Sequence, residues 1–424
     1  MDMSLLWVLP FAVLLAAIAL GPLLNPHWWE KNYASVSLSL AAIIVVHTLF
    51  ISGHPHALFH SLHEYVSFIV LIGSLYIISG GIHVNVKGES DPLMNCAFLL
   101  TGALLANVFG TTGASMVFIR PWIRMNRHRI APYHIIFFIF IVSNIGGALT
   151  PIGDPPLFLG YLKGIPFFWV IENLWAMWAV QMAMLLGIFF VWDSINMRKA
   201  PKRLQHELAS HQEEWRFSGL HNVVFLIFVI AAIFINKPLF LRELLMCGAA
   251  FLSYRLTPKD IHKQNEFNFH PIREVAILFI GIFITMIPAL AWLEHNAKAL
   301  GIESAGHFYW ATGILSGVLD NAPTYLNFLS AACGLFYQGQ LDQPGFHAVQ
   351  ALLGSHPQHI QAISIGAVFF GAMTYIGNGP NFLVKSIAHH SKIKTPSFFG
   401  YITHYSLPIL LPCFALIWYI FFRS

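Results

Sequence analysis

Two aspartates and a set of neutral oxygen-bearing side chains lie in stretches of the chain that are otherwise strongly apolar. Asp154 lies in GGALTPIGDPPLFLGY, and Asp320 lies in LDNAPTYLN. The neutral polar residues of these and two related stretches are Asn107, Thr111, Thr112, Ser115, Ser143, Asn144, Thr150, Asn321, Thr324, Thr374, Asn378 and Asn381. Hard cations prefer oxygen ligands, whereas soft metals prefer sulfur or imidazole. The residue types therefore predict a site for a cation or a proton, with Asp154 and Asp320 as the expected sodium ligands.

The composition indicates a polytopic membrane protein. Of the 424 residues, 57% are hydrophobic and 10% are charged, whereas soluble domains carry about 25% charged residues. Apolar runs recur along the whole length, and a spanning helix needs about 20 mostly apolar residues. We expect an integral protein of a bacterial inner membrane, surrounded by lipid and without a nucleic-acid partner.

No motif for an enzyme or for an ATP-driven pump is visible in the sequence. The four cysteines follow neither a metal-site spacing nor a disulfide framework. No phosphate-binding loop and no nucleophile–base arrangement is found. We therefore expect a protein that is not an enzyme and that has no cofactor beyond the sodium ions and protons it would transport.

The stretch around Asp154 also carries residues that interrupt helices. Residues 146–161 contain three prolines and four glycines, which break or weaken a helix. Irregular backbone at membrane depth is tolerated only where protein or a water-filled cavity covers it. In transporters such breaks surround the substrate and the coupling ion. The broken stretch therefore predicts one wall of a transport site.

The chain contains an internal duplication. GALTPIGDPPLFL at 147–159 and GAMTYIGNGPNFL at 371–383 share eight of thirteen residues, and Asp154 aligns with Asn378. Three weaker matches occur in the same order, 63–75 with 273–285, 101–115 with 312–326, and 165–169 with 395–401. The expected organisation is a first repeat at 1–192, a cytoplasmic linker at 193–219 and a second repeat at 220–424.

The basic residues predict how the repeats are oriented. If the segments 93–119 and 307–337 are re-entrant hairpins, each half has five spanning helices and the second half is inverted. Eighteen of the 23 lysines and arginines then fall on the side of the linker, as the positive-inside rule requires. The predicted fold class is an all-α polytopic membrane protein with two inverted five-helix repeats, each with a re-entrant hairpin and a discontinuous helix.

The pair SNIGGALTPIGDPP and DNAPT resembles the ion transporter superfamily. The greatest similarity is to its group of NhaD-like sodium/proton antiporters and citrate transporters. The resemblance implies a homodimer with scaffold and transport domains, and it implies ion-site positions at Ser143, Asn144, Thr150, Asp154, Asp320, Asn321 and Thr324. The Ser-Asn-Thr signature that dicarboxylate members carry at both hairpin tips is absent.

The charges separate the possible functions. No lysine or arginine lies inside the four polar stretches, which favours a secondary antiporter that exchanges a cation, sodium in the first place, for protons. The alternative is a sodium- or proton-coupled symporter for citrate or another carboxylate or oxyanion. It is supported by half-helix ends that attract anions and by Lys385, roughly 10 Å along a helix from Asn378. Duplicated broken helices argue against a channel or a non-transporting scaffold.

Both aspartates also have a structural interpretation. Asp is a preferred N-cap residue, and Asp154 and Asp320 each precede the second arm of a broken segment. Asn378 and Asn381 could likewise serve only to satisfy unwound backbone.

Overall fold

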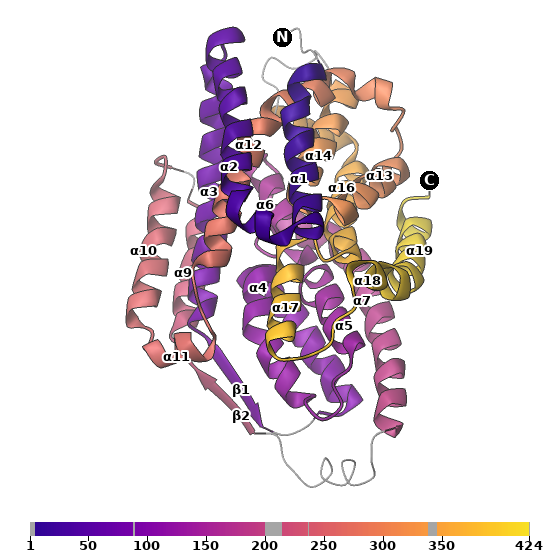
Figure 1. Ribbon diagram of the computed structural model, residues 1–424. Helices are drawn as coiled ribbons and strands as arrows, with labels where there is room; N and C mark the ends of the chain where they lie inside the picture. Colours follow the sequence, from indigo (N-terminus) through magenta and orange to yellow (C-terminus); the bar gives the residue numbers. More distant parts are fainter. Residues whose placement is uncertain (1–4, 88–89, 200–213, 236, 338–345, 424) are drawn as a thin grey trace.

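The structure is a computed structural model that describes residues 5–87, 90–199, 214–235, 237–337 and 346–423 (Figure 1). Nearly all of these residues are helical. Eight helices among them are long and apolar enough to cross a membrane. The protein is therefore an integral membrane protein built from helices, as the composition predicted.

Two long antiparallel helices, α3 (Pro55–Gly80) and α12 (His270–Asn296), form the centre of one side of the molecule. Ser61 Oγ donates to the carbonyl of Phe283 at 2.6 Å near one end of the pair. Tyr76 OH donates to the carbonyl of Asn268 at 2.9 Å near the other end. The two helices correspond to the matched segments 63–75 and 273–285, so equivalent parts of the duplicated sequence run in opposite directions.

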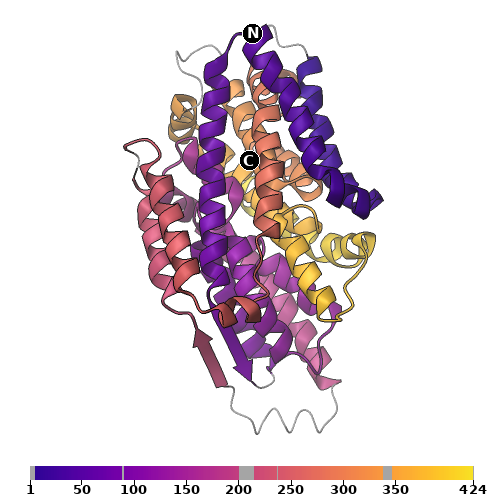
Figure 2. The ribbon, with the colours of Figure 1, turned by 60° about the vertical axis from the view of Figure 1, so that its left-hand side comes forward.

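Each central helix is flanked by a helix pair from the other half of the chain. The pair α1 (Leu9–Leu24) and α2 (Pro26–Val46) packs on α12, and the pair α9 (Asn222–Ile233) and α10 (Leu241–Leu256) packs on α3. Figure 2 shows these two pairs on opposite sides of the central helices. The two halves therefore cross over one another instead of packing as separate bodies.

A helical hairpin is formed by α4 (Pro92–Met125), which reverses direction at Gly110. Gly110 has φ +73°, a left-handed conformation that glycine adopts without steric cost. The two arms lie side by side, because Phe98 packs against Trp122 with ring centroids 5.6 Å apart. The chain thus turns back where the sequence predicted a hairpin tip.

A second helical hairpin is formed by α13 (Ala305–Val318) and α14 (Asn321–Tyr337). Its turn lies at residues 319–320, and Phe308 of the first arm contacts Phe328 of the second with ring centroids 6.4 Å apart. Figure 1 places α4 in the lower half of the molecule and this second hairpin in the upper half.

Two helices are interrupted at the predicted positions. The first consists of α5 (Pro132–Ile141), the 3-10 turn η3 (Ile145–Leu149) and α6 (Pro155–Leu162). The second consists of α16 (Pro357–Phe370), the 3-10 turn η5 (Gly371–Met373) and α17 (Gly379–His390).

Both interruptions use an equivalent pair of glycines to bring the backbone into close contact. A Cβ on Gly153 would lie 2.1 Å from the carbonyl oxygen of Gly147, and a Cβ on Gly377 would lie 2.6 Å from that of Gly371. No side chain fits at such distances. The aligned glycines of the two copies therefore make the same tight loop.

The remaining helices complete the bundle and connect its parts. They are α7 (Phe167–Arg198), α11 (Lys259–Gln264), α15 (Phe346–Ser355), α18 (Phe398–Tyr401), α19 (Leu411–Phe421), the 3-10 helices η1 (Leu5–Val8) and η4 (Ala297–Leu300), and the π-helices η2 (His47–Ile51) and η6 (Ile402–Leu410).

Two details differ from the sequence prediction. The fold predicted as all-α contains one strand pair among the described residues, since α3 ends at Gly80 and β1 (His83–Lys87) pairs antiparallel with β2 (Glu214–Ser218). The helix α7 also continues to Arg198, inside the segment expected as a linker, and β2 occupies the end of that segment. Five-residue strands far apart in the sequence leave no local pattern strong enough to predict the pairing. Residues 200–213, the middle of the expected linker, lie outside the described residues.

Candidate functional site

Asp154 is the centre of a buried hydrogen-bond network that joins all four polar stretches. Its Oδ1 accepts from Thr111 Oγ1 at 2.8 Å and from Asn378 Nδ2 at 2.9 Å. Its Oδ2 accepts from Asn321 Nδ2 at 2.6 Å. Thr111 comes from the tip of α4, Asn321 from the start of α14 and Asn378 from the second broken helix. The carboxylate is 1% exposed, so these three neutral donors take the place of water.

The local sequence frees this carboxylate for contacts with other elements. Asp154 is the N-cap residue of α6, but its side chain makes no capping bond. The first two helical residues, Pro155 and Pro156, have no backbone N–H to offer. The two prolines therefore start the helix and leave the Asp154 oxygens to Thr111, Asn321 and Asn378. The capping interpretation of the Asp154 side chain is wrong.

Amide side chains connect the two broken helices directly. Asn144 Nδ2 donates to Asn381 Oδ1 at 2.7 Å. Asn378 Nδ2 also lies 3.2 Å from Asn144 Oδ1 and 3.2 Å from the carbonyl of Ser143. Asn381 Nδ2 donates to the carbonyl of Thr374 at 2.8 Å. These contacts hold the first interruption against the second, so Asp154 and Asn378 meet although the sequence separates them widely.

Other predicted site residues satisfy the unwound backbone. Asn107 donates from Nδ2 to the carbonyl of Gly146 at 2.7 Å and accepts from the N–H of Leu149 at 2.9 Å. Thr150 Oγ1 donates to the carbonyl of Asn107 at 2.7 Å. In the second copy, Thr374 Oγ1 accepts from the N–H of Gly377 at 3.0 Å. These residues support the shape of the site without touching Asp154.

The serines of the first half form a separate contact. Ser143 Oγ and Ser115 Oγ lie 2.7 Å apart and are both buried. This contact joins the second arm of α4 to the residue where the first broken helix unwinds.

Asp320 does not bond to Asp154. Its Oδ1 accepts from the N–H of Ala322 at 3.0 Å, and Thr324 Oγ1 donates to the carbonyl of Asp320 at 2.9 Å. Both contacts stabilise the first turn of α14. The residue that the hairpin turn presents to Asp154 is its neighbour, Asn321.

A small cavity reaches Asp154 from the side of α3. It has a volume of about 30 Å³, and its lining includes Thr111, Thr112 and Asp154 opposite Leu75 and Tyr76. That volume holds one or two water-sized groups. The site as folded thus has room for a proton carrier or a dehydrated cation beside the carboxylate.

One buried oxygen beside Asp154 is left without a partner. Asn321 is fully buried, and its Oδ1 has no hydrogen-bond donor among the residues that the structure describes. A buried acceptor without a donor is costly, whereas a cation or a protonated carboxyl would satisfy it. The oxygen chemistry of the site therefore fits a sodium ion or a proton.

Two charged clusters were not recognised as such from the sequence. Asp193 accepts from Tyr133 OH at 2.6 Å and from Asn95 Nδ2 at 2.8 Å, and it pairs with Arg129 and with His134. The residues of this cluster come from three separate segments of the chain, and Asp193 is followed by the charged residues at 198–203. Its position at a helix end gave no signal of burial.

The second unrecognised cluster lies around α10. Glu243 Oε1 accepts from Ser67 Oγ at 2.6 Å and from Arg242 Nη2 at 2.7 Å. Near it, Lys163 Nζ lies 2.7 Å from Glu64 Oε1. No local sequence pattern indicates these contacts, because Lys163 is far from Glu64 in the sequence and Ser67 is far from Glu243.

Comparison with protein families gives a match over nearly the whole chain. Residues 1–422 match the model of a protein family described as "Putative citrate transport". A search of curated proteins found no match. The family match covers both halves of the duplication and every residue of the site.

Proposed function

We propose, because the chain belongs to the putative citrate transport family, that it is a secondary transporter that moves citrate or a related carboxylate together with sodium ions or protons. The family match supports transport of an organic anion, which was the alternative in the sequence analysis. It gives no support to sodium/proton antiport, which the sequence analysis preferred.

The environment of Asp154 supports coupling between the binding of an ion and the binding of the carboxylate substrate. Its carboxylate is bonded only to neutral donors, Thr111, Asn321 and Asn378. A buried carboxylate repels an approaching multivalent anion, and the repulsion is strong where the effective dielectric constant is low. A cation or proton on Asp154 removes that repulsion. The coupling ion would therefore bind first and the carboxylate second, as in a symporter.

Inverted repeats with re-entrant hairpins are the architecture that we propose for this transport. The antiparallel course of α3 and α12 supports inversion. So do the two hairpins in opposite halves of the molecule (Figure 1). The glycine pairs that both interruptions share support the duplication. In such transporters the interrupted helices surround the substrate near the bilayer midplane.

The test is uptake of radiolabelled citrate into liposomes that contain the purified protein. We expect uptake that requires an inward sodium or proton gradient. Asp154→Asn should abolish it, because an amide cannot take up a proton or neutralise a cation. Asp91→Asn is the matched control, since the Asp91 side chain accepts from the N–H of Met94 as the N-cap of α4 and is not part of the site. Sodium-driven proton movement without any organic anion would instead contradict this proposal and support sodium/proton antiport.

A further inference from the structure

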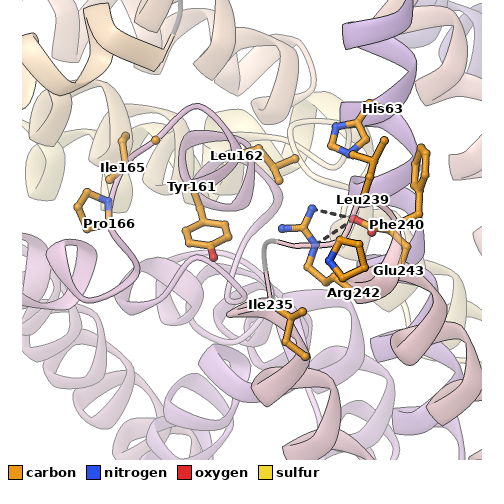
Figure 3. Close-up of a pocket in the computed structure, with 12 residues that line it drawn as sticks. His63, Tyr161, Leu162, Ile165, Pro166, Ile235, Leu239, Phe240, Arg242 and Glu243 are labelled. Carbon is orange, nitrogen blue, oxygen red and sulfur yellow. Dashed lines mark hydrogen bonds and ion pairs between the residues drawn. The ribbon is translucent and has the colours of Figure 1, made fainter.

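A large cavity lies away from Asp154, between the start of α3, the corner that joins α6 to α7, and the loop that joins α9 to α10 (Figure 3). Its volume of about 340 Å³ is in the range of small-molecule sites. Most of the wall is apolar, but Arg242, Glu243 and His63 also line it. Figure 3 shows the Arg242 guanidinium between Tyr161 and Glu243.

The short helix α6 connects this cavity to the Asp154 site. It has eight residues, or about 12 Å at 1.5 Å per residue. Asp154 immediately precedes it and Lys163 immediately follows it. The first turn of α6 lines the small cavity, whereas Tyr161 and Leu162 at its other end line the large one. Because the helix is so short and rigid, a displacement of one end also displaces the other end.

The end of α6 is tied to α3 by an ion pair at the edge of the large cavity. Lys163 Nζ lies 2.7 Å from Glu64 Oε1, and the side chains are 19% and 8% exposed. His60 Nδ1 lies 3.5 Å from the same oxygen. The chain neighbours of the pair, His63 and Leu162, line the cavity. A lysine ammonium is a compact charge on a flexible stem, so it can turn from Glu64 to an anion in the cavity.

We propose that the large cavity is a second binding site for a small carboxylate, and that Lys163 recognises the ligand by exchanging Glu64 for one of its carboxylates. Arg242 supplies the second cationic contact, since its Nε and Nη2 are held by Glu243 while the guanidinium faces the cavity. The exchange releases α6 from α3. Occupancy of the cavity is thereby linked to the helix that carries Asp154. The inference rests on the proposed transport of a carboxylate.

The exchange predicts opposite changes in citrate affinity for two substitutions, Lys163→Ala and Glu64→Gln. Binding of radiolabelled citrate is measured at equilibrium on the full-length detergent-solubilised protein, at high pH and without sodium, so that the charged Asp154 repels citrate from the transport site. Lys163→Ala should weaken binding about tenfold, the loss expected for one hydrogen bond to a charged group. Glu64→Gln should strengthen binding, because Lys163 no longer has a competing carboxylate. Lys163→Arg should retain binding, and Lys237→Ala, at an exposed lysine of the neighbouring loop, should not change it.

The outcomes separate this inference from the proposed function. A pair that is only structural would weaken binding in both Lys163→Ala and Glu64→Gln, and that result overturns the exchange. Unchanged binding in both variants overturns it as well, even if the wild-type protein transports citrate. Lys163-dependent binding without uptake in wild-type liposomes would support the second site and contradict the transport proposal. Absence of both binding and uptake would refute the two together.

Discussion

The buried ion pair of Arg129 with Asp193 should contribute strongly to the stability of the fold, and Asp193→Asn tests it. Asp193 is fully buried and Arg129 is 8% exposed. The Asp193 carboxylate also accepts hydrogen bonds from Tyr133 OH and Asn95 Nδ2. An amide at this position cannot neutralise the guanidinium, and its NH₂ group faces donors. Breaking a buried pair from one side costs about 3–5 kcal/mol, which is at least a hundredfold in the folding equilibrium.

The assay is unfolding of the purified protein by SDS titration, followed by tryptophan fluorescence. The matched control is Asp91→Asn, since Asp91 caps α4 by accepting from the N–H of Met94 at 2.7 Å, and asparagine caps a helix about as well as aspartate does. The double variant Arg129→Met with Asp193→Leu removes both charges and should be more stable than Asp193→Asn. If Asp193→Asn costs no more than Asp91→Asn, the network does not stabilise the fold.

Three further substitutions have definite expected outcomes. Asn321→Ala should raise the half-saturating concentration of the coupling cation in citrate uptake about tenfold, since it removes a hydrogen bond to the Asp154 carboxylate. Gly153→Ala should cost about 1–3 kcal/mol in SDS titration, because the added Cβ would lie 2.1 Å from a carbonyl oxygen, whereas Gly187→Ala, with open space around it, should not destabilise the protein. Lys385→Ala should slow citrate uptake, since this half-buried lysine over the Tyr375 ring is the nearest base along the chain to the second interruption; unchanged uptake would exclude it.

The interruptions of the helices could be predicted because their causes are local. Proline removes a backbone donor, and a glycine pair permits a close backbone approach, whatever surrounds them. The aligned copies then located the second interruption, where Gly371 and Gly377 stand but fewer prolines do. The hairpins at 93–119 and 307–337 were predicted differently, from the distribution of lysines and arginines over the two sides of the membrane.

The partners of the site residues could not be predicted with the same certainty. Asp320 and Asn321 are adjacent, and which of them faces Asp154 depends on the rotation of α14 about its axis. That rotation is set by packing against α12 and α16 of the same half and against α6 of the other half of the chain. The burial of Asp193 and the Lys163–Glu64 pair have the same origin, since each depends on contacts between distant segments.

The divergence of the two copies explains why the site has one acid where the duplication would supply two. Asn378 stands where the first copy has Asp154, and its Nδ2 donates to Asp154 Oδ1 at 2.9 Å. Two carboxylates at that distance could not both be ionised, so a symmetric site would hold a trapped proton. An amide instead donates a hydrogen bond to the single carboxylate. The asymmetry of the repeats therefore places one carboxylate where a symmetric site would hold two, while the fold around it stays duplicated.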